Sequence, residues 1–393
     1  MSPSINPRVH EIAISGIRQF ANQLVHYPDA VNLTIGQPDF PTPDNVKQAA
    51  ISAIENDLTG YSHNAGLIDL RNAVSKFFYG TYNLTYNAET DIIITIGASE
   101  AIDTTFRAIL EPGDEVILPA PFYTGYEPII KLLGCTPVYL NTSDTGFVPD
   151  PKRLEALINE NTKAILFNFP SNPTGVTIEK EQMDALEQVL AQKDVFIVSD
   201  EIYSLNTFEG THTPFASYPS LKDKTFTIHG LSKSHSMTGW RIGFLMGPTD
   251  VMKHCIKIHQ YNAVCASLPS QYAAIEALTN GRDNPAKMNE HYINRRDYLL
   301  ERLHAMGLPV EIPKGAFYLF PSIQHLGMTS FEFCTKLLQD GGVACVPGSA
   351  FSSYGEGFIR ISYAYKMDTL IEGMDRMDKF LQSLNNTRNV ESV

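Results

Sequence analysis

The stretches Val195-Phe-Ile-Val-Ser-Asp200 and Thr225-Phe-Thr-Ile-His-Gly-Leu-Ser-Lys233 decide the fold of this chain. Each is a short, β-prone and mostly apolar run that leads directly to a charged side chain. Such runs are typical of strands that are buried on both faces of a sheet. Because helical patterns such as residues 180–191 lie between runs of this kind, we expect a parallel sheet with helices on both faces.

The same alternation of apolar runs and helical stretches extends from about residue 91 to residue 280. Residues 100–110 form a further helix candidate. The other strand candidates are Ile92–Ile96, Glu115–Leu118, Ala164–Phe169 and Ile242–Met246. The pattern predicts an α/β fold, with the mainly parallel sheet in a large domain that spans residues 46–284.

The pattern changes after about residue 280. Helix and strand candidates alternate there in an α+β arrangement, at residues 288–306, 316–320, 330–339, 358–362 and 367–384. The first 40 residues, rich in Pro and Gly near Gly36-Gln-Pro-Asp39, suggest an arm more than a part of the sheet. We therefore expect residues 1–45 to form an arm that joins a smaller α+β domain, whose C-terminal part is residues 285–393.

Charge and composition exclude several classes of partner. The 393 residues carry a formal net charge of −13, and an acidic surface repels phosphate backbones and anionic lipid headgroups, so we expect neither nucleic acid nor membrane as a partner. The five cysteines are odd in number, widely spaced and without a CxxC pair, which favours a reducing compartment. Residues 1–7 show no signal-peptide pattern and no run approaches 18 apolar residues, so we expect a cytoplasmic protein.

Polar residues that follow the strand candidates suggest a ligand site, because ligands of open α/β sheets bind beyond the carboxyl ends of the strands. Gly97-Ala98-Ser99 follows the strand candidate Ile92–Ile96, and backbone N–H groups at the start of a helix there can hold an anion. The alternative is an ordinary turn with Ser99 as the helix N-cap. Asn172, between two prolines in Pro170–Gly175, can donate to a ligand oxygen, although Asn-Pro is also common turn chemistry.

Asp200 and Lys233 are the charged residues that end the stretches Val195–Asp200 and Thr225–Lys233. Asp200 at the end of a buried strand is costly unless it is paired, for example with a protonated ring nitrogen; the alternative is a helix N-cap. Burial lowers the pKa of a lysine such as Lys233, and a neutral amine forms a Schiff base; the alternative is a lysine that extends its ammonium to water. Arg241, eight residues further on, can clamp a phosphate.

As a set, Gly97-Ala-Ser99, Asn172-Pro-Thr-Gly175, Asp200-Glu-Ile-Tyr203 and Ser232-Lys233 with Gly239-Trp-Arg241 resemble the signature of class I aminotransferases. These are pyridoxal-phosphate (PLP) enzymes of fold type I. The match runs in order along nearly the whole chain and includes Gly36-Gln-Pro-Asp39, Tyr61 and Arg360. The resemblance implies a seven-stranded sheet, a homodimer with shared active sites, and small amino acids and 2-oxo acids as substrates.

The resemblance also implies roles for residues around the cofactor ring. Lys233 would bind PLP covalently and act as general base and acid. Asp200 would pair with the pyridine nitrogen, and Tyr203 and Asn172 would hydrogen-bond the phenolic oxygen. Tyr123 would stack on the ring. Lys233, Asp200 and Tyr203 are the expected catalytic residues.

Further roles concern the phosphate and the substrate. The expected phosphate contacts are Gly97, Ala98, Ser99, Ser232 and Arg241, with Tyr61 from the neighbouring subunit. Gly230 stands where many members have serine, which removes one phosphate contact. Arg360 would bind the substrate α-carboxylate bidentately, assisted by Asn172 and Gly36.

Several alternatives remain beside a transaminase. A PLP-dependent C–S β-lyase or a related lyase shares the cofactor site. A non-catalytic PLP-binding regulator would carry an added DNA-binding domain, for which the charge is wrong and the chain has no room before the arm.

No metal site is expected, because there is no HExxH motif and His254 and His259 are five residues apart. No G-x-G-x-x-G follows a strand, so a dinucleotide is not indicated.

Substrate choice depends on finer resemblance. The chain is similar to the N-acetyl-L,L-diaminopimelate aminotransferases of Gram-positive lysine biosynthesis, through Ser15-Gly-Ile-Arg18, Gly230–Gly239 and Gly348–Gly355. Aromatic and aspartate aminotransferases of the same subgroup share most of these motifs. Glutamate and 2-oxoglutarate as one amino pair is an expectation from the family.

Overall fold

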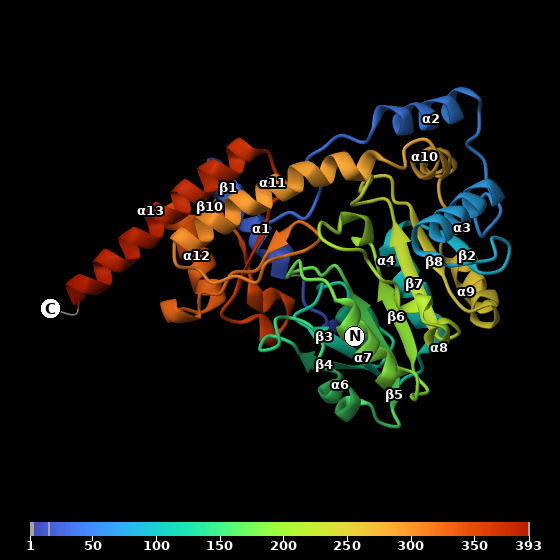
Figure 1. Ribbon diagram of the computed structural model, residues 1–393, viewed down its shortest axis with the longest axis horizontal. Helices are drawn as coiled ribbons and strands as arrows, with labels where there is room; N and C mark the ends of the chain where they lie inside the picture. The colour runs from blue at the N-terminus through green and yellow to red at the C-terminus, as the bar shows by residue number, and fades with distance from the viewer. Residues whose placement is uncertain (1–3, 15, 392–393) are drawn as a thin grey trace.

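A computed structural model describes residues 4–14 and 16–391 of the chain, with the side chains of 17–19, 21 and 385–391 left undescribed. Ser15 of the Ser15–Arg18 motif therefore lies outside the described residues, and the side chain of Arg18 is not described. Figure 1 shows a sheet covered by helices, with a second group of elements beside it that contains the C-terminal helix.

The centre is a seven-stranded sheet of order β2-β8-β7-β6-β5-β3-β4. Its strands are β2 (Ile92–Thr95), β3 (Glu115–Ala120), β4 (Thr136–Asn141), β5 (Thr162–Asn168), β6 (Phe196–Asp200), β7 (Thr225–Gly230) and β8 (Gly243–Met246). Neighbouring strands are parallel except that β8 runs antiparallel to both β2 and β7. The six strand candidates of this region are confirmed, as is the mainly parallel α/β fold. The pattern missed β4, a half-exposed edge strand that contains Pro137.

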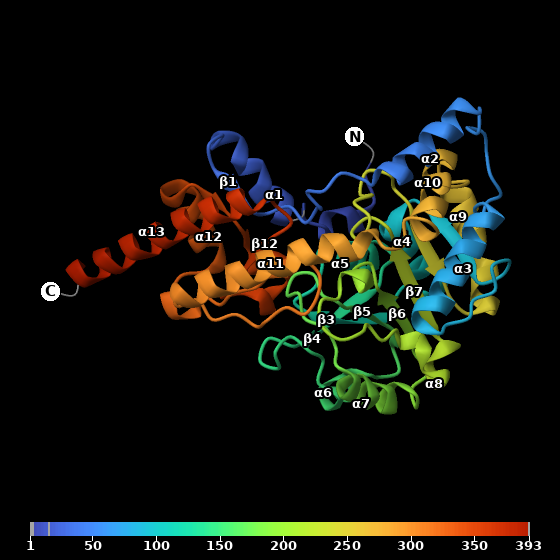
Figure 2. The ribbon, with the colours of Figure 1, turned by 45° about the horizontal axis from the view of Figure 1, so that its top comes forward.

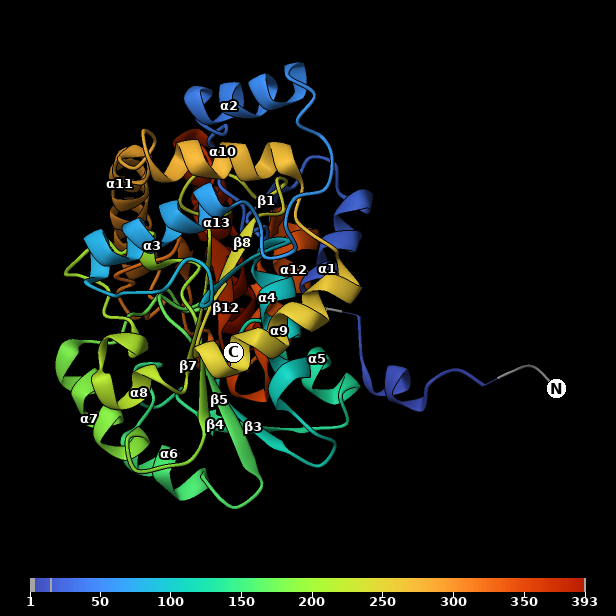
Figure 3. The same cartoon turned by 90° about the vertical axis from the view of Figure 1, so that its right-hand side faces the viewer.

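Helices cover both faces of this sheet (Figure 3). Successive side chains of a strand point to opposite faces: Val116 and Leu118 pack in one hydrophobic cluster, and Ile117 between them packs in another. The first face carries α4 (Gly97–Ile109), α5 (Tyr126–Leu132) and α9 (Thr249–Asn262). The other carries α3 (Ile68–Tyr82), α6 (Pro151–Leu157), α7 (Lys180–Leu190), α8 (Pro219–Lys222) and α10 (Leu268–Leu278), and α2 (Asp44–Glu55) packs on α10. Each fully buried aliphatic side chain stabilises the fold by about 1.5–3 kcal/mol.

The long helix α11 (Asn284–Ala305) leads from the sheet to the second group of elements (Figure 2). This group contains α12 (Ser330–Gly341), α13 (Met367–Glu391) and a three-stranded antiparallel sheet of β11 (Val346–Pro347), β12 (Ile359–Ser362) and β9 (Tyr318–Leu319). The predicted helices and strands are confirmed here, although α13 extends beyond its predicted end. Thr329 and Glu332 form a capping box that starts α12, and Gly342 in the left-handed region ends it.

The N-terminal residues join this second group. β1 (Val31–Asn32) pairs in parallel with β10 (Val343–Ala344), and α1 (Gly16–Gln23) packs against β11. We propose that the chain divides into an arm (1–45), a large domain (46–284) and the C-terminal part of a small domain (285–393). One hydrophobic cluster that combines Val31 and Leu33 with residues of α11, α12 and α13 supports this division. None of the described helices is long and apolar enough to cross a membrane.

An ion pair fixes the arm to α11. Arg295 donates from both Nη atoms to the two carboxylate oxygens of Asp39, at 2.7 and 2.9 Å. The exposed side-chain fractions are 8% for Arg295 and 17% for Asp39, and the ring of Phe40 lies 5.0 Å from the guanidinium. Because Asp39 is three residues from Gly36, this pair holds the Gly36 segment in place.

We expect Asp39→Ala to lower the thermal unfolding midpoint, because it leaves the Arg295 charge buried and unpaired, at a cost of about 3–5 kcal/mol. The matched control is Asp250→Ala, which breaks a 2.8 Å pair with Lys253 in which the Asp250 side chain is 92% exposed. Differential scanning calorimetry of both variants checks this. Equal midpoints for the two variants would contradict a stabilising role of the Asp39–Arg295 pair.

Candidate active site

Three neighbouring parallel strands bring Asp200, Lys233 and Asn172 to the carboxyl-terminal side of the sheet. Asp200 ends β6, Lys233 follows the end of β7, and Asn172 follows the end of β5. The register places Asn168 opposite Asp200, and Asp200 opposite Ile228. The carboxyl ends of β5, β6 and β7 therefore lie side by side, as the topology of open α/β sheets requires of a ligand site.

Lys233 is half-buried and its amine is held by the arm. Nζ donates to the backbone oxygen of Gly36 at 2.8 Å and lies 5.7 Å from the centre of the Tyr203 ring. Burial, with the positive charges of Arg360 and Arg241, lowers the pKa of Lys233 to about 8, although Asp200 opposes the shift. The amine is therefore bound within the protein rather than extended to water, and a large fraction of it is neutral near pH 8.

Asp200 is buried, and each of its carboxylate oxygens accepts one hydrogen bond. Its Oδ2 accepts a 2.6 Å hydrogen bond from the Tyr126 hydroxyl, and its Oδ1 accepts one from the Ile202 N–H at 3.2 Å. Burial raises the pKa of Asp200 to about 6, against the effect of the Tyr126 hydrogen bond. The residues that follow form a turn, and the next helical segment begins only at Ser204, so Asp200 caps no helix. The carboxylate remains mainly ionised at pH 7 and above.

Arg360 in β12 is buried without a carboxylate partner among the described residues. Its Nη1 donates to Asn172 Oδ1 at 2.8 Å and its Nη2 donates to the Thr34 oxygen at 2.5 Å. Its Nε is buried and finds no hydrogen-bond partner among residues 4–14 and 16–391, as far as their side chains are described. Burial lowers the pKa of the guanidinium. A buried guanidinium in this state is costly, and a ligand carboxylate offers it the charge-assisted hydrogen bonds that it lacks.

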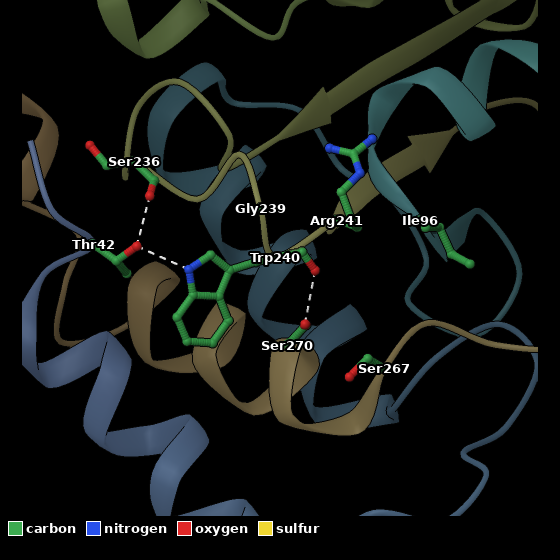
Figure 4. A pocket seen from close by; sticks show the side chains of 8 residues that line it. All are labelled: Thr42, Ile96, Ser236, Gly239, Trp240, Arg241, Ser267 and Ser270. Carbon is green, nitrogen blue, oxygen red and sulfur yellow. Dashed lines mark hydrogen bonds between the residues drawn. The ribbon is translucent and has the colours of Figure 1, made fainter. Parts of the chain in front are cut away.

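Arg241 lies against the N-terminal turn of α4, where the anion site was predicted (Figure 4). Gly97 has φ of +78°, and a Cβ there would lie 2.5 Å from Nη2 of Arg241, so only glycine permits this approach. The helix starts at Gly97 and its N-cap is Ile96, so Ser99 lies inside the first turn and is not the N-cap. A cavity of about 600 Å³ opens beside Arg241, bounded by Ile96 and Trp240. An arginine at a helix N-terminus is suited to an anion such as phosphate.

Glu100 steadies this turn from its outer side. Its Oε2 accepts a hydrogen bond from the Ile96 N–H, and its Oε1 lies 2.6 Å from Nδ1 of His259, which is fully buried on α9. His259 therefore pairs with a carboxylate.

The remaining predicted residues occupy different surroundings. Ser232 is buried directly before Lys233, and Tyr123 packs its ring edge-on against Tyr126 with 5.3 Å between ring centres. Ala98 lies in the first turn of α4. Tyr61 stands apart: it lies between α2 and α3, and its side chain is 86% exposed. The chain itself does not bring Tyr61 to the other site residues.

The sequence analysis missed several residues that hold the site together. Asn168 donates to the Asp200 backbone oxygen at 3.0 Å and accepts a 3.0 Å bond from the Asn172 N–H. Tyr126 binds Asp200, and Tyr318 binds Tyr203 at 2.6 Å. Asn168 carries a detectable signal, because it is a polar residue inside a buried apolar run and not beyond its end. Nothing in the local sequence marks Tyr126 or Tyr318.

Comparison with known proteins identifies the family. The family model "Aminotransferase class I and II" matches residues 28–377. The chain belongs to this family. It is 52% identical over 393 residues to the probable N-acetyl-LL-diaminopimelate aminotransferase of Bacillus subtilis, covering 98% of this chain and 100% of that protein.

Solved structures agree with this assignment. The aspartate aminotransferase from Thermus thermophilus with maleate has a TM-score of 0.92 and 34% identity, covering 96% of this chain and 100% of that one. The aromatic aminotransferase from Pyrococcus horikoshii has a TM-score of 0.90 and 34% identity, covering 96% and 98%. The chain is thus an amino-group-transferring enzyme of fold type I that depends on PLP.

The residues of this aminotransferase fit the cofactor. A buried, mainly ionised Asp200 can pair with a protonated ring nitrogen. Lys233 supplies an amine of lowered pKa at the neighbouring strand end. Arg241 and the start of α4 offer positive charge and backbone N–H groups to a phosphate.

We expect Lys233 of the PLP-free protein to titrate near pH 8, and Arg360→Gln to raise its pKa, because the substitution removes a nearby positive charge. The pH dependence of acetylation of Lys233 with acetic anhydride, followed by peptide mass spectrometry, measures this. Arg153→Gln, which removes an exposed arginine paired with Asp144, serves as the control and should leave the midpoint unchanged. A wild-type midpoint near that of ordinary lysines would refute the effect of burial.

Proposed function

We propose that this aminotransferase acts on N-acetyl-L,L-diaminopimelate in lysine biosynthesis, with glutamate and 2-oxoglutarate as the other amino pair. The observation that carries the proposal is the 52% identity to the Bacillus subtilis relative over 98% of this chain and all of that protein. Aspartate aminotransferase from Pyrococcus abyssi is 37% identical over 96% of this chain, so aspartate or aromatic donors are the second candidate. The five cysteines, all described and all unpaired, fit a cytoplasmic location.

We propose the residue roles that the family resemblance implies, and the contacts of the described residues support them. Arg360 would bind the substrate α-carboxylate, for which its unpaired Nε and its position beside Asn172 are suited. Gly36, whose backbone oxygen meets Lys233, would border the same carboxylate. With the carboxylate fixed in this way, Arg360 would orient the substrate so that its Cα–H bond faces Nζ of Lys233. Holding the reacting groups in this way supplies much of the rate enhancement of an enzyme.

Proton transfer would be the work of Lys233. PLP, when bound, supplies an electron sink that makes the α-proton of an amino acid acidic. The lowered pKa of Lys233, about 8, lets Nζ accept that proton near neutral pH and return it later in the same half-reaction. Asp200 would keep the ring nitrogen protonated, while Tyr203 and Asn172 would donate to the phenolic oxygen and Tyr123 would stack on the ring.

The phosphate would be held by Gly97, Ala98, Ser99, Ser232 and Arg241, and by Tyr61 of a second subunit. Exposed apolar side chains support a homodimer: Ile96, which lines the Arg241 cavity, is exposed, as are Val264 and Tyr261 on the segment that precedes the lining residue Ser267, with Tyr261 88% exposed. Asn64 Nδ2 donates to the Val264 oxygen at 2.9 Å, so the loop that carries Tyr61 belongs to this surface. A large exposed tyrosine in such a patch is typical of an interface residue.

The first test of the substrate proposal is the visible spectrum of the PLP-loaded enzyme with single amino donors. N-acetyl-L,L-diaminopimelate and glutamate should each bleach the absorbance of the lysine-bound cofactor, and 2-oxoglutarate should restore it. Lys233→Ala should lack that absorbance from the start. Faster bleaching by aspartate or phenylalanine than by the acetylated donor would replace the substrate assignment. Release of ammonia or pyruvate without need for an oxo acid would identify a lyase.

Shared active sites predict subunit complementation. Tyr61→Ala and Lys233→Ala homodimers should both be weak, but in a hybrid dimer one site has an intact Lys233 and receives Tyr61 from the partner. Mixing and re-forming dimers in equal amounts should restore about one quarter of wild-type activity, because half of the dimers are hybrids with one complete site. Because Tyr61 is exposed, Tyr61→Ala should fold normally. Absence of recovery, with hybrids demonstrated by differently tagged subunits, would place Tyr61 outside the shared site.

A further inference from the structure

Tyr318 contacts three residues with proposed roles, although no role has been assigned to it. It lies in β9 and is buried. Its hydroxyl is 2.6 Å from the Tyr203 hydroxyl, and its ring centre is 4.5 Å from the Arg360 guanidinium. A Cβ at Gly36 would lie 1.9 Å from the Tyr318 hydroxyl, so the arm passes directly over this atom and position 36 must be glycine.

The ring of Tyr318 provides a platform for Arg360. The Phe351 ring lies 4.9 Å from the same guanidinium, so two aromatic rings contact a cation that has no carboxylate partner in the described part of the chain. Cation–π attraction is strongest where the cation is desolvated, as it is here. The platform fixes the plane of a guanidinium whose hydrogen-bond partners, among the described residues, are the Asn172 and Thr34 oxygens.

The hydroxyl of Tyr318 acts on a different neighbour. Burial raises the pKa of both Tyr203 and Tyr318, so each keeps its proton at neutral pH. Only one of the two can donate within their shared hydrogen bond. If Tyr203 donates its own proton to a cofactor oxygen, Tyr318 must donate to Tyr203. A donor that itself accepts a hydrogen bond is a stronger donor.

We propose that Tyr318 is a positioning residue that acts at both ends of the site: its hydroxyl orients and strengthens Tyr203 as a donor, and its ring holds Arg360 in the plane that receives a carboxylate. The inference rests on the roles proposed above for Tyr203 and Arg360. The two functions reside in different parts of one side chain. Two substitutions can therefore separate them.

Tyr318→Phe removes the hydroxyl alone. In the PLP-loaded enzyme, the visible absorbance of the cofactor changes with pH, and we call the midpoint of that change the spectral pKa. We expect the spectral pKa to rise by about half a unit, a threefold change in proton affinity, because Tyr203 becomes a weaker donor to the phenolic oxygen of the cofactor. The dissociation constant of maleate, a dicarboxylate that lacks an amine, should stay within about twofold because the ring remains. Tyr363→Phe, which removes a buried hydroxyl bound to the Ala316 oxygen at 3.2 Å, is the matched control and should change neither value.

Tyr318→Leu removes the ring as well. It should show the same spectral shift and, in addition, about tenfold weaker maleate binding. PLP content and the thermal midpoint verify that this variant is folded. An unchanged spectral pKa in Tyr318→Phe overturns the proposal, whatever the leucine variant does. Equal maleate affinity in folded Tyr318→Leu and wild type overturns the platform.

Two further variants separate this inference from the function on which it rests. Arg360→Gln should weaken maleate binding strongly, and Tyr203→Phe should raise the spectral pKa at least as much as Tyr318→Phe. If either fails, the roles proposed for Arg360 or Tyr203 are wrong. If both succeed while the Tyr318 variants match wild type, only the role of Tyr318 falls.

Discussion

The burial of Arg360, which has no carboxylate partner in the described part of the chain, is the constraint on which the rest of the site depends. Removing a guanidinium from water costs several kcal/mol unless its hydrogen bonds are replaced. The protein replaces only some of them, with the Asn172 and Thr34 oxygens, and adds two aromatic rings. Hydrophobic packing around it offsets the remaining cost, and the proposed binding of a substrate carboxylate would recover it. Under the role proposed for Arg360, the folded protein would thus favour substrates that carry a carboxylate.

Burial in the same site shifts the pKa values of Lys233 and Asp200 in opposite directions. It disfavours the charged form of each group, so the pKa of Lys233 falls to about 8 and that of Asp200 rises to about 6. Between these values the carboxylate is mainly ionised while part of the amine is neutral, which is the combination that a proton-transferring lysine beside a ring-binding carboxylate requires. Specific contacts limit the shifts: Tyr126 stabilises the Asp200 anion, and the attraction between Asp200 and Lys233 moderates the loss of the lysine proton. A single physical effect, modulated by a few neighbours, thus sets both protonation states.

Sequence reasoning identified the parts of this arrangement that depend on strand ends and missed those that depend on tertiary contacts. Asp200 and Lys233 follow buried apolar runs, and parallel strands bring such ends together whatever their loops contain. Asn168 interrupts the apolar pattern of its strand, but it was not predicted as a site residue. Tyr318 lies in an aromatic run that is typical of a core strand. Its importance comes from Tyr203 and Gly36, which are 115 and 282 residues away in sequence. The edge strand β4 was missed for a related reason, since half-exposed residues give no continuous apolar run.

The site is complete only when both ends of the chain are in place. The Thr34 oxygen binds Arg360, 326 residues further on, and the Gly36 oxygen binds Lys233, 197 residues further on. The pairing of β1 with β10 and of Asp39 with Arg295 holds the segment that carries both oxygens. Closing such long loops has an entropic cost that these non-local contacts offset. Strand pairing in the sheet holds Asp200, Lys233 and Asn172, whereas the proposed carboxylate pocket also needs the docked arm. Under the roles proposed above, the arm would therefore affect substrate binding although it contributes no strand to the seven-stranded sheet.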